Sequence, residues 1–314
     1  MSYKNSIIVV LIALSLHGIS SSVFRLLTRR AYPVHEQGAV LISGASKGIG
    51  KHAALFLAEK GFTVYAGVRN DKDGKLLQKE STGDVKPILL DVTKSKQIDE
   101  AVAKISKDLE SSNESLIGVI NNAGIMYREL WETQPMEHMR KLFDVNVLGA
   151  VELTQACLPL LKKSKGRIIN IGSIAGFTVT PFMTVYSGSK FALRGISEGL
   201  RRELSHFDIS VSLIETGIVK TDLNGLSGID NVTDPSKKAE YEDLLAMNGM
   251  DYNQLAWEKS DVSPSIHQAL TEKYPKTSYQ CAGLGPVSAG LLKTLVNVIP
   301  ERWIDLRVSV RPSS

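Results

Sequence analysis

The chain has 314 residues, a length that suits one α/β domain with an appendage. Hydrophobic residues make up 43% and charged residues 22%, which is ordinary for a protein that buries a large core. The formal net charge of +4 is mild and no basic stripe accompanies it, so the composition favours neither nucleic acid nor an acidic partner. The two cysteines are too few for a disulfide framework, and the six histidines show no metal-ligand spacing, so we assign no metal.

The N-terminal segment departs from this ordinary composition. Residues 7–24 are mostly apolar and uncharged, which places them at the short end of a membrane-spanning helix. Three arginines follow within residues 25–30, so the positive-inside tendency predicts that the rest of the protein faces the cytosol. A cleaved signal peptide is the alternative, because residues 20–22 are small. Sugars at the sequons of Asn113 or Asn231 would instead place the protein in the lumen.

We therefore expect two parts: a membrane anchor and linker over residues 1–36, and a single dinucleotide-binding catalytic domain over residues 37–314. In the second part, short apolar runs alternate with helical patterns. Strands are predicted at residues 39–43, 62–68, 85–90, 116–121, 167–171 and 209–214. Helices are predicted at residues 51–60, 97–109, 136–161 and 185–205. This alternation predicts a Rossmann-like α/β fold, a doubly wound parallel sheet with helices on both faces.

A glycine-rich loop, residues 44–50 (GASKGIG), joins the first predicted strand to the first helix. Backbone N–H groups and the helix dipole can meet a pyrophosphate there, and glycine permits the close approach that a Cβ would block. The spacing G-x-x-x-G-x-G differs from the usual G-x-G-x-x-G, so the strand–loop–helix context carries the interpretation. A glycine-rich turn without a ligand is the alternative.

The charges near this loop bear on which dinucleotide binds. Sites for the 2′-hydroxyl form usually have an acidic residue at the end of the second strand. Here Val68 stands at that place and Arg69 follows it, while Lys47 lies in the glycine loop. Two cations suit a 2′-phosphate, so the sequence favours NADP. Solvated surface charges are the alternative, and Asp71 nearby keeps NAD possible.

Tyr186 and Lys190 are four residues apart and share one face of a predicted helix. A neighbouring cation stabilises the phenolate and lowers a pKa that is ordinarily ~10. We therefore expect Tyr186 to exchange protons near neutral pH, as an acid/base catalyst does. Taken alone, the pair is more typical of a helix surface, and the rest of the chain decides between the two interpretations.

The motifs taken together resemble the short-chain dehydrogenase/reductase family over residues 39–221, and more loosely to the end of the chain. The motifs appear in the family's order: the three loop glycines, the run Asn121-Asn122-Ala123-Gly124, then Asn146, Ser173, Tyr186 and Lys190. The resemblance implies that Tyr186 is the acid/base, that Lys190 lowers its pKa, and that Ser173 fixes the substrate oxygen. It implies that Asn146 supports a water connecting Lys190 to solvent.

The same resemblance implies a set of cofactor-binding residues, among which Asp91 meets the adenine and the glycines meet the pyrophosphate. The set consists of Gly44, Ser46, Lys47, Gly48, Ile49, Gly50, Arg69, Asp91, Asn122, Ala123, Gly124, Tyr186, Lys190, Gly217, Ile218 and Thr221.

The C-terminal third gives weaker indications of the substrate. Residues 224–271 lie where this family covers its substrate. Apolar residues there are expected either to line a pocket or to pack a helical lid on the core: Leu223, Leu226, Met247, Met250 and Trp257. Residues 273–283 and 300–302, like the N-terminal segment, are similar to the retinol and hydroxysteroid dehydrogenase branch.

The resemblance thus implies an NADP(H)-dependent oxidoreductase that interconverts an alcohol and a carbonyl on a retinoid, steroid or other lipid. It implies a homodimer through the helices of residues 136–161 and 185–205, anchored to a membrane, that of the endoplasmic reticulum, with the catalytic domain facing the cytosol. Two alternatives stay open: a carbonyl reductase of a smaller or polar metabolite, and a dinucleotide-binding interaction protein without turnover.

Overall fold

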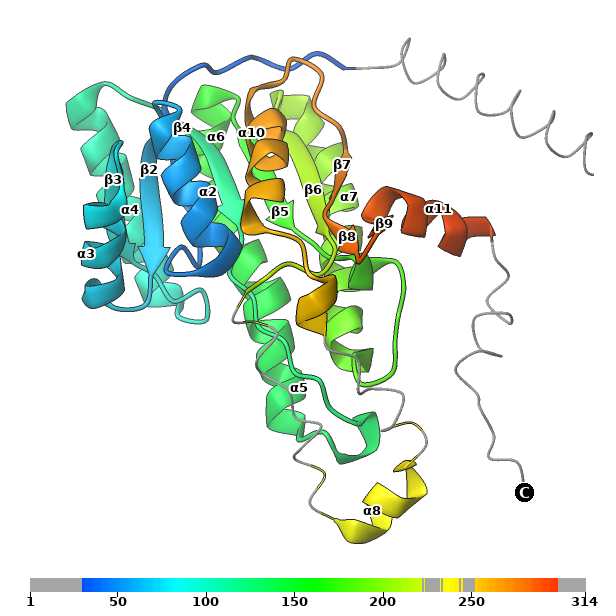
Figure 1. The fold of residues 1–314 in the computed structure, drawn as a ribbon. Helices are drawn as coiled ribbons and strands as arrows, with labels where there is room; N and C mark the ends of the chain where they lie inside the picture. Colours follow the sequence, from blue (N-terminus) through cyan, green and yellow to red (C-terminus); the bar gives the residue numbers. More distant parts are fainter. Residues whose placement is uncertain are drawn as a thin grey trace, which may run out of the picture.

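The computed structural model describes residues 30–221, 223, 232, 234–242, 244 and 252–298. At its centre lies a seven-stranded parallel sheet in the order β3-β2-β1-β4-β5-β6-β7 (Figure 1). Its strands are β1 (Ala39–Ile42), β2 (Thr63–Val68), β3 (Val85–Leu89), β4 (Leu116–Asn121), β5 (Arg167–Ile171), β6 (Ser210–Thr216) and β7 (Ser278–Cys281). The reversal of strand order between β1 and β4 creates a crevice at the carboxyl ends of these strands, where ligands of such sheets bind.

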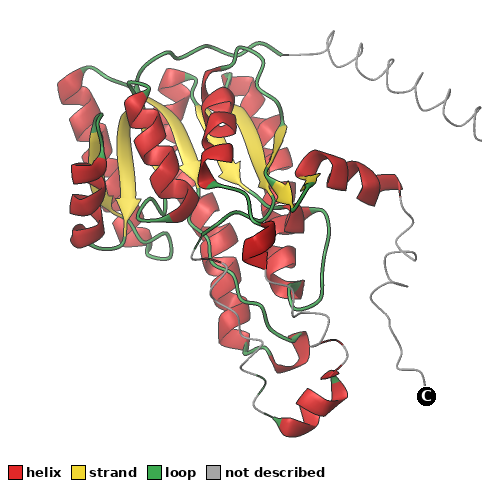
Figure 2. Cartoon of the chain, viewed as in Figure 1, coloured by secondary structure: helices red, strands yellow, loops and turns green. Residues whose placement is uncertain are grey.

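Helices cover both faces of the sheet, as Figure 2 shows. One face packs against α2 (Gly48–Glu59), α3 (Asp71–Glu80) and α10 (Ser263–Thr271). The other packs against α4 (Ser95–Ser112), α6 (Gly149–Ser164) and α7 (Thr184–Leu204). The central strands are buried along their whole length, which explains why their sequences are mainly apolar. The predicted parallel fold is therefore confirmed.

The seventh strand, β7, was not predicted. Its sequence is short and half polar because it lies at the edge of the sheet, where Gln280 is exposed. Two short strands, β8 (Gly283–Leu284) and β9 (Val287–Ser288), follow it and lead into α11 (Ala289–Val298). A short helix, α8 (Pro235–Glu240), lies away from the sheet at the lower end of the view in Figure 1.

The single helix predicted over residues 136–161 is two helices in the structure. A π-helical turn, Asp144–Leu148, separates α5 (Met136–Phe143) from α6. The wider turn changes the direction of the side chains without interrupting the helical apolar pattern, so the sequence did not reveal it. Asn146 lies within this turn and is almost fully buried.

Several predictions fall outside the described residues: the anchor over residues 7–24, the pocket residues Leu226, Met247 and Met250, the sequon at Asn231, and residues 300–302. Within the part of the chain that the structure describes, no helix is long and apolar enough to cross a membrane.

Candidate active site

The glycine loop lies close to the chain that follows β4. Gly44 has a φ of +67°, and a Cβ placed on it would lie 2.9 Å from the Cα of Ala123. A Cβ on Gly50 would lie 2.3 Å from Nδ2 of Asn122. Gly44 therefore needs glycine because the backbone after β4 occupies the space of a side chain, and Gly50 needs it because the Asn122 side-chain amide and the Gly44 carbonyl oxygen occupy that space. The predicted motif residues of β1 and β4 are thus brought together.

Polar contacts fasten this junction. Oγ of Ser43 accepts hydrogen bonds from the backbone N–H groups of Asn122 and Ala123, both at 3.1 Å. Nδ2 of Asn122 donates to the carbonyl oxygens of Ser43 and Gly44, both at 3.0 Å. Ser43 is a structural residue of the site that sequence reasoning did not include, although its place at the end of the first strand was a signal.

The loop after β6 lies over the glycine loop. Gly48 has a φ of +61°, and a Cβ on it would lie 3.4 Å from Cγ2 of Thr221. The loop after β6 is itself held in place, because the backbone N–H of Ile218 donates to the carbonyl oxygen of Gly283 at 2.8 Å. A side chain at position 48 would therefore enter the space between the two loops, which is the cradle that a pyrophosphate fits.

The first turn of α2 faces this cradle without a side-chain cap. Its N–H groups are the donors that a phosphate would use. Lys47 and Arg69 are both exposed near this end of the sheet. Burial raises the pKa of Asp91, but hydrogen bonds from Thr93 and the charges of Lys94 and Arg69 outweigh it and hold the pKa below its usual value. Arg69 is therefore close enough to act on Asp91, the residue predicted to meet the adenine.

The four predicted catalytic residues are buried and come from three elements. Ser173 follows β5 at the start of a short 3-10 turn, where its Oγ accepts the N–H of Ala175 at 3.1 Å. Tyr186 and Lys190 occupy the first two turns of α7. Asn146 lies in the π turn between α5 and α6. Each side chain is less than one-tenth exposed.

Burial shifts the pKa values of Tyr186 and Lys190 in opposite directions, away from each other. It raises the pKa of Tyr186 to about 12, against the smaller opposing effect of a hydrogen bond with Ser173. It lowers the pKa of Lys190 to about 8. The pKa of Tyr186 therefore shifts in the direction opposite to the expected lowering. The reason is that burial penalises both charged forms, and Nζ of Lys190 donates to the carbonyl of Ile171 at 3.0 Å.

Asn146 fastens the chain after β4 to α7. Its Oδ1 accepts the N–H of Ile125 at 2.8 Å, and its Nδ2 donates to the carbonyl of Ile125 and to Oγ of Ser189. A Cβ on Gly124 would lie 3.4 Å from Oδ1 of Asn146 and 3.8 Å from Nζ of Lys190. The Asn122–Gly124 segment thus connects the glycine loop to the catalytic set.

Apolar side chains surround Tyr186. Met126, Leu142 and Ala175 are buried with it, and partly buried residues pack against this cluster: Ile125, Tyr127, Met183, Val185 and Leu223. Leu223 packs against this cluster. Trp257 packs on the main core, which agrees with the alternative of a packed lid, and its Nε1 donates to the carbonyl of Gly285. Met126 and Ala175 were missed; their signal was their place directly after two predicted motifs.

A parallel sheet with a phosphate cradle at its switch point, and a buried Ser–Tyr–Lys set beside that cradle, defines a dinucleotide-dependent oxidoreductase. The short chain dehydrogenase family matches residues 38–230, and the chain belongs to this family, whose members are oxidoreductases of hydroxyl and carbonyl groups. The predicted resemblance is confirmed.

Relatives with assigned activities support this membership. Estradiol 17-beta-dehydrogenase 2 of Mus musculus is 38% identical over 62% of this chain, but the match covers only 51% of that protein. Retinol dehydrogenase 16 of Rattus norvegicus is 32% identical, with 82% of this chain and 85% of that protein covered. A crystal structure of a short-chain dehydrogenase from Streptomyces avermitilis has a TM-score of 0.69 at 25% identity, covering 88% of this chain and 99% of that one.

Proposed function

We propose that the protein is an NADP(H)-dependent oxidoreductase that interconverts an alcohol and a carbonyl on a lipophilic substrate. The observation that carries the proposal is the buried set of Ser173, Tyr186 and Lys190 beside the cradle formed by the glycine loop. Three ionisable or hydroxyl side chains are buried together at a cost in solvation, which is expected where a proton must move away from bulk water.

In carbonyl reduction, Oη of Tyr186 donates its proton to the substrate oxygen as negative charge develops there. Oγ of Ser173 is hydrogen-bonded with Tyr186 and orients the same oxygen. The ammonium of Lys190 stabilises the phenolate that remains. When bound, the nicotinamide cofactor supplies or accepts the hydride, which is the redox half of the reaction.

The residues around the cradle suit the phosphorylated dinucleotide. The uncapped first turn of α2 and the loop glycines would hold the pyrophosphate, and Asp91 and the Asn122–Gly124 segment would line the adenosine and nicotinamide ends. Arg69 supplies positive charge at the end of β2, where a 2′-phosphate would lie and where no carboxylate stands, and Lys47 supplies a second positive charge in the glycine loop.

The apolar cluster around Tyr186 supports a lipophilic substrate, because Met126, Ala175 and Leu223 offer no polar group to a small hydrophilic one. The relatives named for estradiol and retinol agree with this chemistry. A second candidate is a small hydroxy acid, since D-beta-hydroxybutyrate dehydrogenase of Mus musculus is 30% identical over 80% of each chain.

We also propose that the chain is anchored to a membrane through residues 7–24 and that it forms a homodimer. The anchor is supported by the apolar composition of that segment and by the arginines that follow it. The dimer is supported by exposed apolar side chains along α5, the π turn and α7: Phe143, Leu148 and Phe191.

The mechanism is tested by mixing the full-length protein with NADPH and a panel of retinoid, steroid and short-chain carbonyls, with NADH as a parallel arm. Tyr186→Phe is expected to lower kcat by a factor of about 10² to 10⁴, because it removes the donated proton but keeps the ring. Binding of NADPH by fluorescence titration serves as the folding control. Undiminished turnover by Tyr186→Phe would refute the assigned mechanism.

A further inference from the structure

A buried carboxylate pairs with a histidine close to the proposed substrate site. Glu129 is only 6% exposed, and both of its carboxylate oxygens lie near Nδ1 of His138, at 2.9 Å and 3.1 Å. Within the described residues, no other hydrogen bond is found for the Glu129 carboxylate or for the His138 ring. A carboxylate buried this deeply needs a partner, so the contact fixes the histidine with a proton on Nδ1.

His138 lies on the face of its helix that is directed at the catalytic set. Positions 138 and 142 are four residues apart on α5 and therefore share a face. Asn146 holds the chain beside Lys190, and Leu142 is buried in the cluster that contains Tyr186. His138 lies one turn before Leu142 on α5, and its side chain is 31% exposed.

The ring of His138 is also held flat against the site. It stacks on Tyr127, with ring centroids 4.2 Å apart and planes 4° from parallel. Tyr127 in turn packs against the cluster around Tyr186. The backbone N–H of Glu129 donates to the carbonyl of Phe182 at 3.0 Å, which ties the pair to the loop between Ser173 and Tyr186. The histidine is thus fixed relative to the catalytic side chains from two directions.

With Nδ1 bonded to Glu129, Nε2 is the atom that remains for a ligand. It accepts a hydrogen bond when the ring is neutral and donates one when the ring is protonated. Either state suits a hydroxyl, which can donate or accept, and the protonated ring also suits a ketone oxygen. The negative charge of Glu129 directly behind the ring disfavours a carboxylate or phosphate at the same place.

We propose that Glu129 and His138 form a recognition site for a second, uncharged oxygen on the substrate, remote from the carbon that reacts at Tyr186. The inference rests on the proposed function and adds to it a substrate class: apolar molecules with an oxygen at each end. His138 touches the remote oxygen, and Glu129 is a positioning residue that fixes the tautomer and orientation of His138.

The test uses the full-length protein, NADPH, and matched pairs of unbranched alkanals and ω-hydroxyalkanals of increasing chain length. For each chain length, kcat/KM of the ω-hydroxyalkanal is divided by kcat/KM of the alkanal. This ratio is expected to reach a maximum at the chain length that spans the distance from Tyr186 to His138. His138→Phe keeps a flat ring over Tyr127 but lacks Nε2, and is expected to lower that ratio about tenfold, through KM. Glu129→Gln is expected to lower it less, because the side chain keeps its shape.

His206→Phe is the matched control, since His206 is an exposed histidine beside Phe207 beyond the end of α7, and this variant is expected to keep the wild-type ratio. A wild-type ratio without a maximum at any chain length, or an unchanged ratio in His138→Phe, would overturn the inference.

A binding arm separates this inference from the proposed function. The same aldehyde pairs are titrated calorimetrically into Tyr186→Phe loaded with NADPH, with and without His138→Phe. If the wild-type protein reduces no carbonyl, the proposed function fails. The dissociation constants of the hydroxylated and the plain aldehyde still decide the role of His138. A preference for the hydroxylated partner that disappears with His138→Phe supports the recognition site; equal dissociation constants in both variants contradict it.

Discussion

Tyr186 and Lys190 are buried together, and their pKa values move in opposite directions for the same physical reason. Burial disfavours the charged form of each, so the pKa of the phenol rises to about 12 and the pKa of the ammonium falls to about 8. Nζ of Lys190 lies 5.8 Å from the centre of the Tyr186 ring. Over the neutral range the protein therefore holds a protonated phenol and a lysine close to losing its charge.

This pairing predicts a pH dependence of carbonyl reduction. Below about pH 8 Lys190 is protonated and its charge stabilises the phenolate formed when Tyr186 donates its proton. As pH rises through about 8 that charge is lost, so kcat is expected to fall although Tyr186 is still protonated. The measurement is kcat under saturating NADPH and carbonyl at increasing pH.

Lys96→Met is the control for the pH profile, because Lys96 is an exposed lysine paired with Glu100 on α4. It is expected to leave the profile unchanged. A wild-type profile that stays level until the ionisation of Tyr186 would show that the charge of Lys190 does not contribute.

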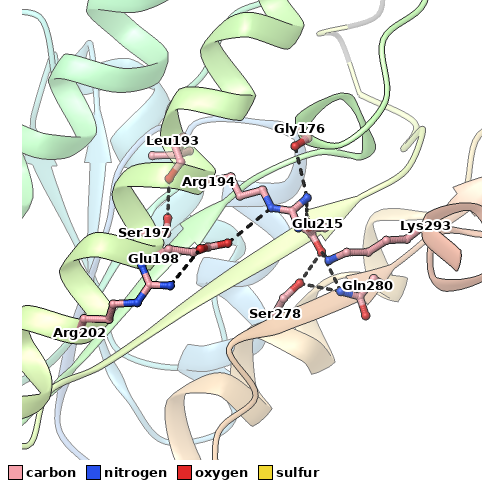
Figure 3. Close-up of polar contacts among 10 residues, drawn as sticks. All are labelled: Gly176, Leu193, Arg194, Ser197, Glu198, Arg202, Glu215, Ser278, Gln280 and Lys293. Carbon is pink, nitrogen blue, oxygen red and sulfur yellow. Dashed lines mark hydrogen bonds and ion pairs between the residues drawn. The ribbon is translucent and has the colours of Figure 1, made fainter. Parts of the chain in front are cut away.

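Between elements, the buried carboxylate of Glu215 on β6 connects several parts of the fold (Figure 3). One of its oxygens, Oε2, accepts hydrogen bonds from Lys293 of α11 at 2.6 Å, from Gln280 at 2.7 Å and from Oγ of Ser278. The other, Oε1, lies 3.4 Å from Nη1 of Arg194 on α7. Burial raises the pKa of Glu215, but the hydrogen bonds from Lys293 and its neighbours outweigh it and hold the pKa below its usual value. The carboxylate thus joins β6, β7, α7 and α11.

Removing one cation from this carboxylate is expected to destabilise the protein. Lys293→Met should lower the free energy of unfolding by about 2 kcal/mol, because a buried charge loses a direct partner. Since the folded pKa of Glu215 is depressed, its contribution is present above the unfolded pKa and is lost as pH falls, so the difference between the two proteins should shrink in acid. Chemical denaturation at neutral and acidic pH measures both effects.

Arg202→Met serves as the matched control on α7. The pair that Arg202 forms with Glu198 is exposed, with a separation of 3.4 Å, and is expected to contribute less than about 1 kcal/mol. If Lys293→Met were no more destabilising than Arg202→Met, the Glu215 contacts would not hold α11 in place.

At the scale of the whole molecule, exposed apolar side chains gather where α5 and α7 lie side by side. The ring of Phe143 lies 4.0 Å from the place of a Cβ on Gly188, which shows that the two helices share this surface. Leu148 and Phe191 extend it, and both are exposed. Exposed apolar residues on adjacent helices are the kind of surface that a second subunit covers.

Leu148→Asp combined with Phe191→Asp is therefore expected to give a monomer, because two charges would have to be buried in the interface. Sedimentation velocity measures the molecular mass in solution. Leu291→Asp is the control, since Leu291 is equally exposed but lies on α11. A double variant that sediments like the wild-type protein would place the subunit interface elsewhere, or exclude a dimer.

The sequence alone determined the features that depend on local patterns. Short, mainly apolar runs alternating with helical patterns predicted six parallel strands, because strands covered on both faces carry mainly apolar residues. The glycines of residues 44–50 and the spacing of Tyr186 and Lys190 marked the site, because backbone approach and a shared helix face leave short-range signatures.

Only the tertiary structure decided the features that depend on residues distant in the sequence. The π turn at Asn146 is set by packing between α5, α6 and the chain after β4, and the direction of the Tyr186 pKa shift is set by burial from all sides. Glu129 and His138 form a pair only because a loop and a helix meet in space. Such contacts leave no periodicity in the sequence, since each partner alone is an ordinary polar residue.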